Sequence, residues 1–338
     1  MSDHPGLRAA DLRKLLAAND VEVQGELNIE LISGGRSNLT FTVSDDVHRW
    51  VTRRPPLAGL TPSAHDMERE WAVTAALTGT PVPVAAPVAI DRTGEFIGAP
   101  CTVVDFVDGQ VIRSEEDLQA WTDDEVAANF DALVHTLADL HAVDYRAVGL
   151  ADFGRPEGFA ARQVKLWARQ WGLVKTRELP DVERLAAALT ERVPAQAASS
   201  IVHGDFRVDN TILAPGDPAR VAAVVDWEMA ALGDPLTDVA LMCIYREPVF
   251  SAVLGFDAAW TSARYPDPDH MAQRYAQIAG TDLGDWQFYL GLANLKLGVI
   301  AEGITHRALQ GGSSGAAGAE HAAEATASFI AAGLAAIG

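Results

Sequence analysis

The side chains best suited to chemistry lie between residues 201 and 228. His203, Gly204 and Asp205 form a short run, Asn210 follows five residues after Asp205, and Asp226 ends an apolar stretch. Phosphoryl transfer from a nucleotide uses this set. One carboxylate orients the acceptor hydroxyl and takes its proton, while a carboxamide oxygen and a second carboxylate hold Mg²⁺. Singly, Asp and Asn are typical of turns and caps, but the combination favours a phosphotransferase site.

Short strands are expected to deliver these side chains. Ile201 and Val202 lead into His203, the Pro-Gly-Asp sequence at 215–217 marks a hairpin turn, and the apolar run 221–225 leads to Asp226. The polar residues follow directly on apolar runs, so we expect them at the ends of neighbouring short strands.

Two motifs in this segment carry a family resemblance. HGDFRVDN and VVDWE resemble the HGD-x-x-x-x-N and D-W/F-E signatures of the aminoglycoside phosphotransferase and choline kinase superfamily, which is related to protein kinases. ISGGRSNLTF, VTRRPP, SAHDMERE, CTVVDFVDG and GDPLTDVALM extend the resemblance over nearly the whole chain, and are similar to the subgroup associated with acyl-CoA dehydrogenases. The resemblance implies an α+β, protein-kinase-like bilobal fold, with a small antiparallel-sheet lobe, a larger mainly helical lobe, and ATP and Mg²⁺ between them.

Roles follow from the resemblance position by position. It makes Asp205 the catalytic base or hydroxyl-positioning group, and Asn210 and Asp226 the Mg²⁺ ligands. His203 and Asp238 become structural supports of the catalytic loop. Asp238 follows the helix-start signal Asp234-Pro235 in an apolar helix, where a carboxylate needs hydrogen-bond donors to be tolerated. For Glu228 a supporting role beside the metal and a solvated position both remain open.

The N-terminal part supplies the nucleotide-binding residues in this interpretation. A phosphate-covering loop is expected between two strands, although its glycines do not match G-x-G-x-x-G; its candidates are Gly34, Gly35, Arg36, Ser37 and Asn38. Arg53 occupies the place of the ATP-binding cation, with Arg54 as the alternative that points the other way, and Glu70 is the expected ion-pair partner. Asp105 to Val107 resembles the adenine hinge, which would act through backbone groups.

The expected organisation is an N-terminal lobe at 1–105, a hinge at 106–110 and a C-terminal catalytic and acceptor-binding lobe at 111–338. The first lobe is read as strands with one helix, from an N-cap at Ser63 to Gly79. After the hinge, apolar residues at spacings of three and four predict helices. They cover about 123–144, 157–175, 181–192, 268–280 and 285–309, and an Ala-rich helix ends the chain.

The acceptor pocket is the least determined part. Six aromatic residues either line it or belong to the core: Trp167, Trp171, Tyr245, Trp260, Tyr265 and Tyr289. Lys296 and Arg307 fall on one face of a predicted helix, either as a solvated basic stripe or as an anion-binding site. An aminoglycoside would need clustered carboxylates, whereas the subgroup resemblance points to a hydroxyacyl-CoA acceptor. An aminoglycoside, choline or homoserine-type kinase and a nucleotide-binding pseudokinase acting as an interaction module remain alternatives.

Composition limits the partners. The 338 residues carry a formal net charge of −20, which repels nucleic acid and anionic lipid at long range. Charged residues make up 21% and hydrophobic residues 49%, as in folded globular proteins. No apolar run is long enough to span a membrane, and the first ten residues lack the apolar core of a secretory signal. Cys101 and Cys243 sit among apolar residues, so we expect buried, reduced thiols in a cytoplasmic protein.

Overall fold

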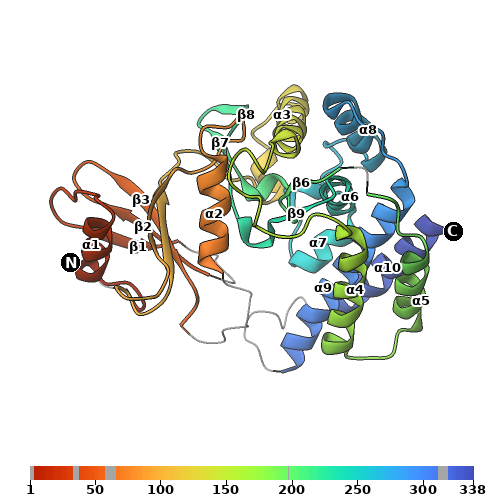
Figure 1. Cartoon of the computed structure of the whole chain (residues 1–338). Helices are drawn as coiled ribbons and strands as arrows, with labels where there is room; N and C mark the ends of the chain where they lie inside the picture. Colours follow the sequence, from red (N-terminus) through yellow and green to blue (C-terminus); the bar gives the residue numbers. More distant parts are fainter. Residues whose placement is uncertain (1–3, 33–37, 58–65, 197, 311–318) are drawn as a thin grey trace.

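The computed structural model describes residues 4–32, 38–57, 66–196, 198–310 and 319–338. These residues form two lobes, one built on a sheet near the N-terminus and a larger one that is mainly helical (Figure 1). The α+β bilobal architecture expected from the sequence is therefore confirmed. No helix within the described ranges is long and apolar enough to cross a membrane.

The N-terminal lobe is built on an antiparallel sheet with strand order β1-β2-β3-β5-β4. Burial alternates along the strands: in β3, Trp50 and Thr52 are buried while their neighbours are more exposed. The β2–β3 turn is held by the Asp45 carboxylate, which accepts hydrogen bonds from the backbone N–H groups of Val47 and His48. The strands are β1 (Asn28–Leu31), β2 (Leu39–Ser44), β3 (Arg49–Arg54), β4 (Pro87–Asp91) and β5 (Cys101–Asp105).

Two helices, rather than the single expected one, flank this sheet on opposite sides (Figure 1). The unpredicted helix α1 (Ala9–Ala18) buries Leu12, Leu15 and Leu16 against the sheet. Helix α2 (Met67–Leu77) lies on the side that faces the C-terminal lobe. It begins at Met67, and the Asp66 carboxylate caps it by accepting from the Arg69 N–H. Ser63 is outside the described residues.

In the C-terminal lobe, helices surround two small antiparallel sheets. One sheet pairs β6 with β9, and the other is the expected hairpin of β7 and β8. Strands and helices are β6 (Ser200–Val202), β7 (Thr211–Ala214), β8 (Asp217–Val224), β9 (Ala231–Gly233), α3 (Asp123–Ala142), α4 (Phe159–Val174), α5 (Pro180–Glu191), α6 (Leu236–Tyr245), α7 (Val249–Leu254), α8 (Pro268–Ala279), α9 (Trp286–Leu309) and α10 (Ala319–Ile337). Four short 3₁₀ segments connect them: η1 (Glu115–Leu118), η2 (Val208–Asn210), η3 (Trp227–Met229) and η4 (Ala259–Thr261).

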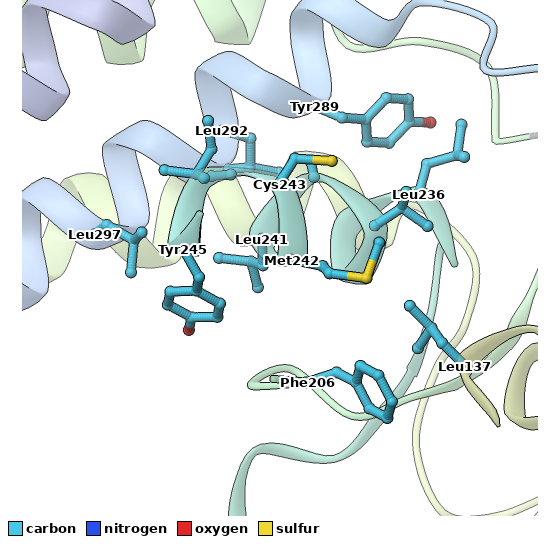
Figure 2. Close-up of a cluster of buried hydrophobic side chains, with 14 of the residues drawn as sticks. Leu137, Phe206, Leu236, Leu241, Met242, Cys243, Tyr245, Tyr289, Leu292 and Leu297 are labelled. Atoms are coloured by element: carbon cyan, nitrogen blue, oxygen red, sulfur yellow. The ribbon is translucent and has the colours of Figure 1, made fainter. Parts of the chain in front are cut away.

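Helix α9 is the centre of this lobe. It contacts α4, α5, α6 and α10, so its middle part is buried on all sides. Helix α6 packs beside it, and Figure 2 shows Leu241 and Cys243 of α6 on the side of Leu292 and Leu297 of α9, while Met242 points away from α9. Cys101 and Cys243 are both buried free thiols. This core fixes α6 and α9 against the segment that carries the candidate site.

Candidate active site

The loop of residues 203–210, called the 203–210 loop below, follows β6 and is fixed through its backbone. Asp238, fully buried in the first turn of α6, accepts hydrogen bonds from the N–H groups of His203 (2.6 Å) and Gly204 (2.7 Å). The His203 ring bonds the Val225 carbonyl through Nε2 (3.0 Å) and takes the Asp205 N–H on Nδ1 (3.2 Å). One tautomer, with the proton on Nε2, satisfies both contacts. His203 and Asp238 thus lie where the sequence expected supports.

Aromatic side chains of the two motifs pack around that histidine. Phe206 and Trp227 are buried, and their ring centroids lie 6.0 Å and 4.7 Å from that of His203. The Trp227 indole also donates to the Val224 carbonyl at 3.0 Å. The apolar positions of HGDFRVDN and VVDWE therefore anchor the backbone, which leaves the polar positions free to face the space between the lobes.

Asp205 is held by donors on both carboxylate oxygens. Oδ1 accepts from the Tyr245 hydroxyl (2.5 Å) and Arg207 Nε (3.3 Å), and Oδ2 accepts from Asn210 Nδ2 (2.8 Å). Burial acts to raise the pKa of Asp205, but Arg207, the Tyr245 hydrogen bond and Lys296 outweigh it and lower that pKa. The carboxylate is therefore ionised at neutral pH, while its side chain keeps 24% of its surface exposed.

Asn210 and Asp226 are brought together by the ends of the hairpin. The Asn210 carbonyl accepts from the Val225 N–H at 2.9 Å, which places the residue before Asp226 beside the loop. Both side-chain contacts of Asn210 to Asp205 use Nδ2, so Oδ1 is the amide atom suited to bind a metal ion. Asp226 adopts a left-handed backbone conformation (φ 68°) two residues after the end of β8.

Arg53 links the two lobes. From β3 it pairs with Glu70 of α2 (3.0 Å) and with Asp226 of the C-terminal lobe (3.1 Å). Asn38 adds a hydrogen bond to Glu70 at 3.3 Å. Arg54 points to the other face, where it is buried and donates to the carbonyls of Gly6 and Pro55. The geometry thus places Arg53, and not Arg54, in the space between the lobes.

Negative charge is in excess around Arg53. Burial acts to lower the pKa of Arg53, but the negative charges of Glu70, Asp226 and Glu228 outweigh it and raise that pKa. Burial, followed by the charge of Asp226, raises the pKa of Glu228 to about 7; burial, only partly offset by Arg53, raises that of Glu70 to about 7. Glu228 Oε2 is buried and lacks a hydrogen-bond partner within the described part of the chain. Glu228 is therefore beside the site rather than a freely solvated residue.

This donor set fits Mg²⁺ bound together with a nucleotide. Among the described residues, no group of three or more His, Cys, Asp or Glu side chains has the arrangement of a metal site. Mg²⁺, however, is usually held by one or two carboxylates with substrate phosphates and water completing its shell. The Asp226 carboxylate, the Asn210 amide oxygen and the surplus negative charge meet that requirement.

The remaining nucleotide-binding candidates are less informative. Gly34, Gly35, Arg36 and Ser37 lie outside the described residues. Asp105 ends β5, and its N–H is already bonded to the Ala86 carbonyl at 2.8 Å. Val107 is half-buried in the segment after β5. The proposed hinge at 106–110 stays a prediction.

Of the two alternatives for Lys296 and Arg307, a solvated basic stripe does not describe Lys296, and the two cations differ in burial. Lys296 is only 7% exposed, because it lies in the central part of α9, while Arg307 is exposed near the end of that helix. Lys296 Nζ donates to the Gly204 carbonyl at 2.5 Å and lies 5.6 Å from the centre of the Trp167 ring. Helical periodicity placed both cations on one side but did not show what packs there.

A cavity of about 250 Å³ lies against the 203–210 loop. Gly204, Glu228 and Lys296 form part of its wall, and Arg69 reaches it from α2. Most of its other lining residues are apolar: Phe159, Leu166, Trp167, Val202, Met229, Ala230, Ala231, Leu241, Leu292 and Ala293. Of the six aromatic candidates, Trp167 and Tyr289 line this cavity, Tyr245 contacts Asp205, and Trp171, Trp260 and Tyr265 are buried in the core.

Two contacts of Asp205 were not anticipated. Arg207, two residues after Asp205, pairs with both Asp205 and Asp209. Tyr245 was expected only as a possible pocket or core residue. The sequence could have predicted the contacts of Arg207, because a cation that stands between two aspartates is expected to pair with them. The sequence could not have predicted the contact of Tyr245, because it depends on how α6 packs against the 203–210 loop.

Comparisons with known proteins identify a family and several relatives. The sequence pattern of the phosphotransferase enzyme family matches residues 28–289. Acyl-CoA dehydrogenase family member 10 of Mus musculus is 32% identical over 86% of this chain and 28% of its own length. Family member 11 of Gallus gallus is 33% identical over 86% of this chain and 38% of its own length. The chain thus spans about a third of the length of these curated relatives.

Solved structures share the fold. A Ralstonia eutropha JMP134 protein, named as an aminoglycoside phosphotransferase, superimposes with a TM-score of 0.83 at 31% identity, covering 98% of both chains. Aminoglycoside phosphotransferase APH(4)-Ia, solved with AMP-PNP and hygromycin B, gives a TM-score of 0.60 at 16% identity, covering 96% of this chain and 97% of that one. The second likeness concerns the fold alone. With the family pattern covering most of its length, this chain belongs to the phosphotransferase enzyme family.

Proposed function

We propose that this chain transfers the γ-phosphoryl group of ATP, bound with Mg²⁺, to a hydroxyl group of a small molecule. The observation that carries the proposal is a path of contacts and bonded neighbours. It runs from Asp205 to Asn210, whose carbonyl bonds the N–H of the residue before Asp226, and from Asp226 through Arg53 to Glu70. It joins three distant parts of the chain at the space between the lobes.

Each residue has a role in this proposal. Asp205, ionised and fixed in orientation, accepts the hydrogen bond of the acceptor hydroxyl and aligns it for attack. Arg53 binds phosphate oxygens of the nucleotide, held in place by Glu70. Asn210 and Asp226 hold Mg²⁺, which when bound neutralises phosphate charge. Gly34, Gly35, Arg36, Ser37 and Asn38 are proposed to cover the phosphates, and Asp105 to Val107 to contact adenine.

The acceptor is proposed to be a hydroxyacyl-CoA or a related hydroxy-acid thioester. The cavity beside the 203–210 loop supports this, because its wall is mainly apolar and its charged side chains are Arg69, Lys296 and Glu228 in the part of the chain that the structure describes. A polycationic aminoglycoside would require several carboxylates there. At about 250 Å³ the cavity has room for part of an acyl chain, so the CoA moiety would extend outside it.

A phosphoryl-transfer screen tests both levels of the proposal. The protein is incubated with Mg-ATP and, separately, hydroxyacyl-CoAs of increasing acyl length, the matching free hydroxy acids, aminoglycosides, choline and homoserine, and ADP formation is followed. We expect turnover with the thioesters and a KM that changes with acyl length. Turnover of an aminoglycoside, choline or homoserine alone would overturn the acceptor but retain the phosphotransferase.

A nucleotide-binding test covers the remaining alternative. Mg-ATP should raise the thermal unfolding temperature, because a ligand that binds only the folded state stabilises it. Stabilisation by Mg-ATP without turnover of any acceptor in the screen would favour a pseudokinase that acts as an interaction module.

A further inference from the structure

The peptide group between Gly204 and Asp205 is gripped at both of its polar atoms. Lys296 Nζ, from α9, donates to the Gly204 carbonyl at 2.5 Å, and the Asp205 N–H donates to His203 Nδ1 at 3.2 Å. Because a peptide group is planar, these two contacts together set the orientation of the whole unit that precedes the Asp205 Cα. The direction in which the Asp205 side chain leaves the backbone therefore depends on Lys296.

The neighbouring peptide leaves little freedom for the loop to move. The Gly204 N–H is bonded to Asp238, so α6 and α9 hold Gly204 from its two sides with opposite charges. Gly204 adopts φ +81°, and a Cβ added there would lie 2.8 Å from the Met229 carbonyl oxygen. Only glycine fits this close approach, and the charged contacts from α6 and α9 hold it in this conformation.

A buried lysine in the centre of α9 needs an explanation beyond stability. Its neighbours Leu295 and Leu297 are buried apolar residues, as expected for a helix packed on all sides. Burying an ammonium group costs several kcal/mol unless partners compensate it. Burial lowers the pKa of Lys296, and the carboxylates of Asp205 and Asp238 act in the opposite direction. An apolar residue would serve packing better at this position.

We propose that Lys296 is a positioning residue for phosphoryl transfer, which holds the Gly204 carbonyl and thereby aims the Asp205 carboxylate at the acceptor hydroxyl. This inference rests on the proposed phosphotransferase function. It differs from direct acceptor binding by Lys296, which also lines the cavity. Loss of positioning lowers kcat, whereas loss of an acceptor contact raises the KM of the acceptor.

The test compares Lys296→Met, Lys296→Gln and Lys296→Arg with the wild-type protein, using the acceptor that gives turnover in the screen. Misplacing a reacting group by about 1 Å costs roughly 100-fold in rate, so Lys296→Met should lower kcat by about that factor while the KM values of ATP and acceptor stay near wild type. Lys296→Gln removes the charge and shortens the side chain, so its kcat should fall as well, which keeps the test open if the methionine variant does not fold. Lys296→Arg, which retains charge and donors, should recover part of the loss.

Lys165→Met provides the matched control, because Lys165 is exposed on the neighbouring helix α4 and undergoes the same chemical change. Its kinetics should match wild type. A kcat near the wild-type value in Lys296→Met, or in Lys296→Gln where the methionine variant does not fold, would overturn the positioning role. A raised acceptor KM with unchanged kcat, or no recovery by arginine, would overturn it as well. Absence of turnover in the wild-type protein would instead count against the proposed function.

Discussion

Replacing Asp205 by asparagine would remove the carboxylate that the proposed reaction needs while keeping a side chain of nearly the same shape. Both carboxylate oxygens of Asp205 accept hydrogen bonds, from Tyr245 and Arg207 on one and from Asn210 on the other. An amide has a single oxygen, so its NH₂ group must face one of these donors. We expect a loss on the order of 1–3 kcal/mol in the free energy of unfolding.

The effect on catalysis should be larger than the effect on folding. Domains are typically stable by roughly 5–15 kcal/mol, so the folded state should still dominate. Loss of a general base typically lowers turnover by roughly 10²–10⁴-fold, and we expect kcat for the Asp205→Asn variant in that range. Arg53, Glu70 and Asp226 are unchanged, so the Kd of Mg-ATP should stay near wild type.

The assay follows ADP release with the acceptor from the screen, and calorimetry measures the Kd of Mg-ATP. Asp209→Asn is the matched control, because Asp209 lies in the same loop, also pairs with Arg207 and loses the same charge. It should retain turnover within a few-fold of wild type. An Asp205→Asn variant that is equally active, or an equal loss in both variants, would refute the role given to Asp205.

Three further outcomes are expected. Asp226→Ala should weaken Mg-ATP binding, because Asn210 is a neutral ligand that cannot balance the phosphate charge; unchanged affinity by calorimetry would contradict this. Asp238→Ala leaves two N–H groups of the 203–210 loop without their acceptor. At roughly 1–3 kcal/mol for each unsatisfied group, urea unfolding should show a loss of about 2–6 kcal/mol, and an unaltered midpoint would speak against it. The pKa of Glu70 is raised by burial from 4.5 to about 7, so in that pH window the folded chain keeps a proton that the unfolded chain releases, and stability falls as pH rises. Glu70→Gln should reduce this slope in unfolding experiments across the window, while the part that comes from Glu228, whose pKa is raised to about 7 as well, should remain; an unchanged slope would exclude a contribution from Glu70.

The 203–210 loop could be predicted from the sequence because its decisive relations are local. Asp205 and Asn210 are five residues apart, and their contact at 2.8 Å forms within one short loop. The apolar runs before His203 and Asp226 likewise predicted strand ends. Both are confirmed, because β6 ends directly before His203 and β8 ends two residues before Asp226. The hairpin of β7 and β8 was visible in the turn chemistry of the Pro-Gly-Asp sequence.

Short elements with weak patterns were harder to predict. Helix α1 has only ten residues, and its apolar side chains become a helix face only once the sheet lies against them. Strand β9 has three residues and exists through its pairing with β6, about thirty residues earlier in the chain. Neither leaves a periodic signal long enough to distinguish it from a loop.

The sequence by itself determined which side chains could perform phosphoryl transfer and which of them lie in one loop. Only the tertiary structure decided that Arg53 rather than Arg54 meets Asp226, 173 residues away. Strand alternation separates the two arginines onto opposite faces, but the packing of the lobes selects the face that meets the site. The same holds for Lys296. The period of a helix predicts the side to which a side chain points, but whether that side is buried depends on the elements packed against it.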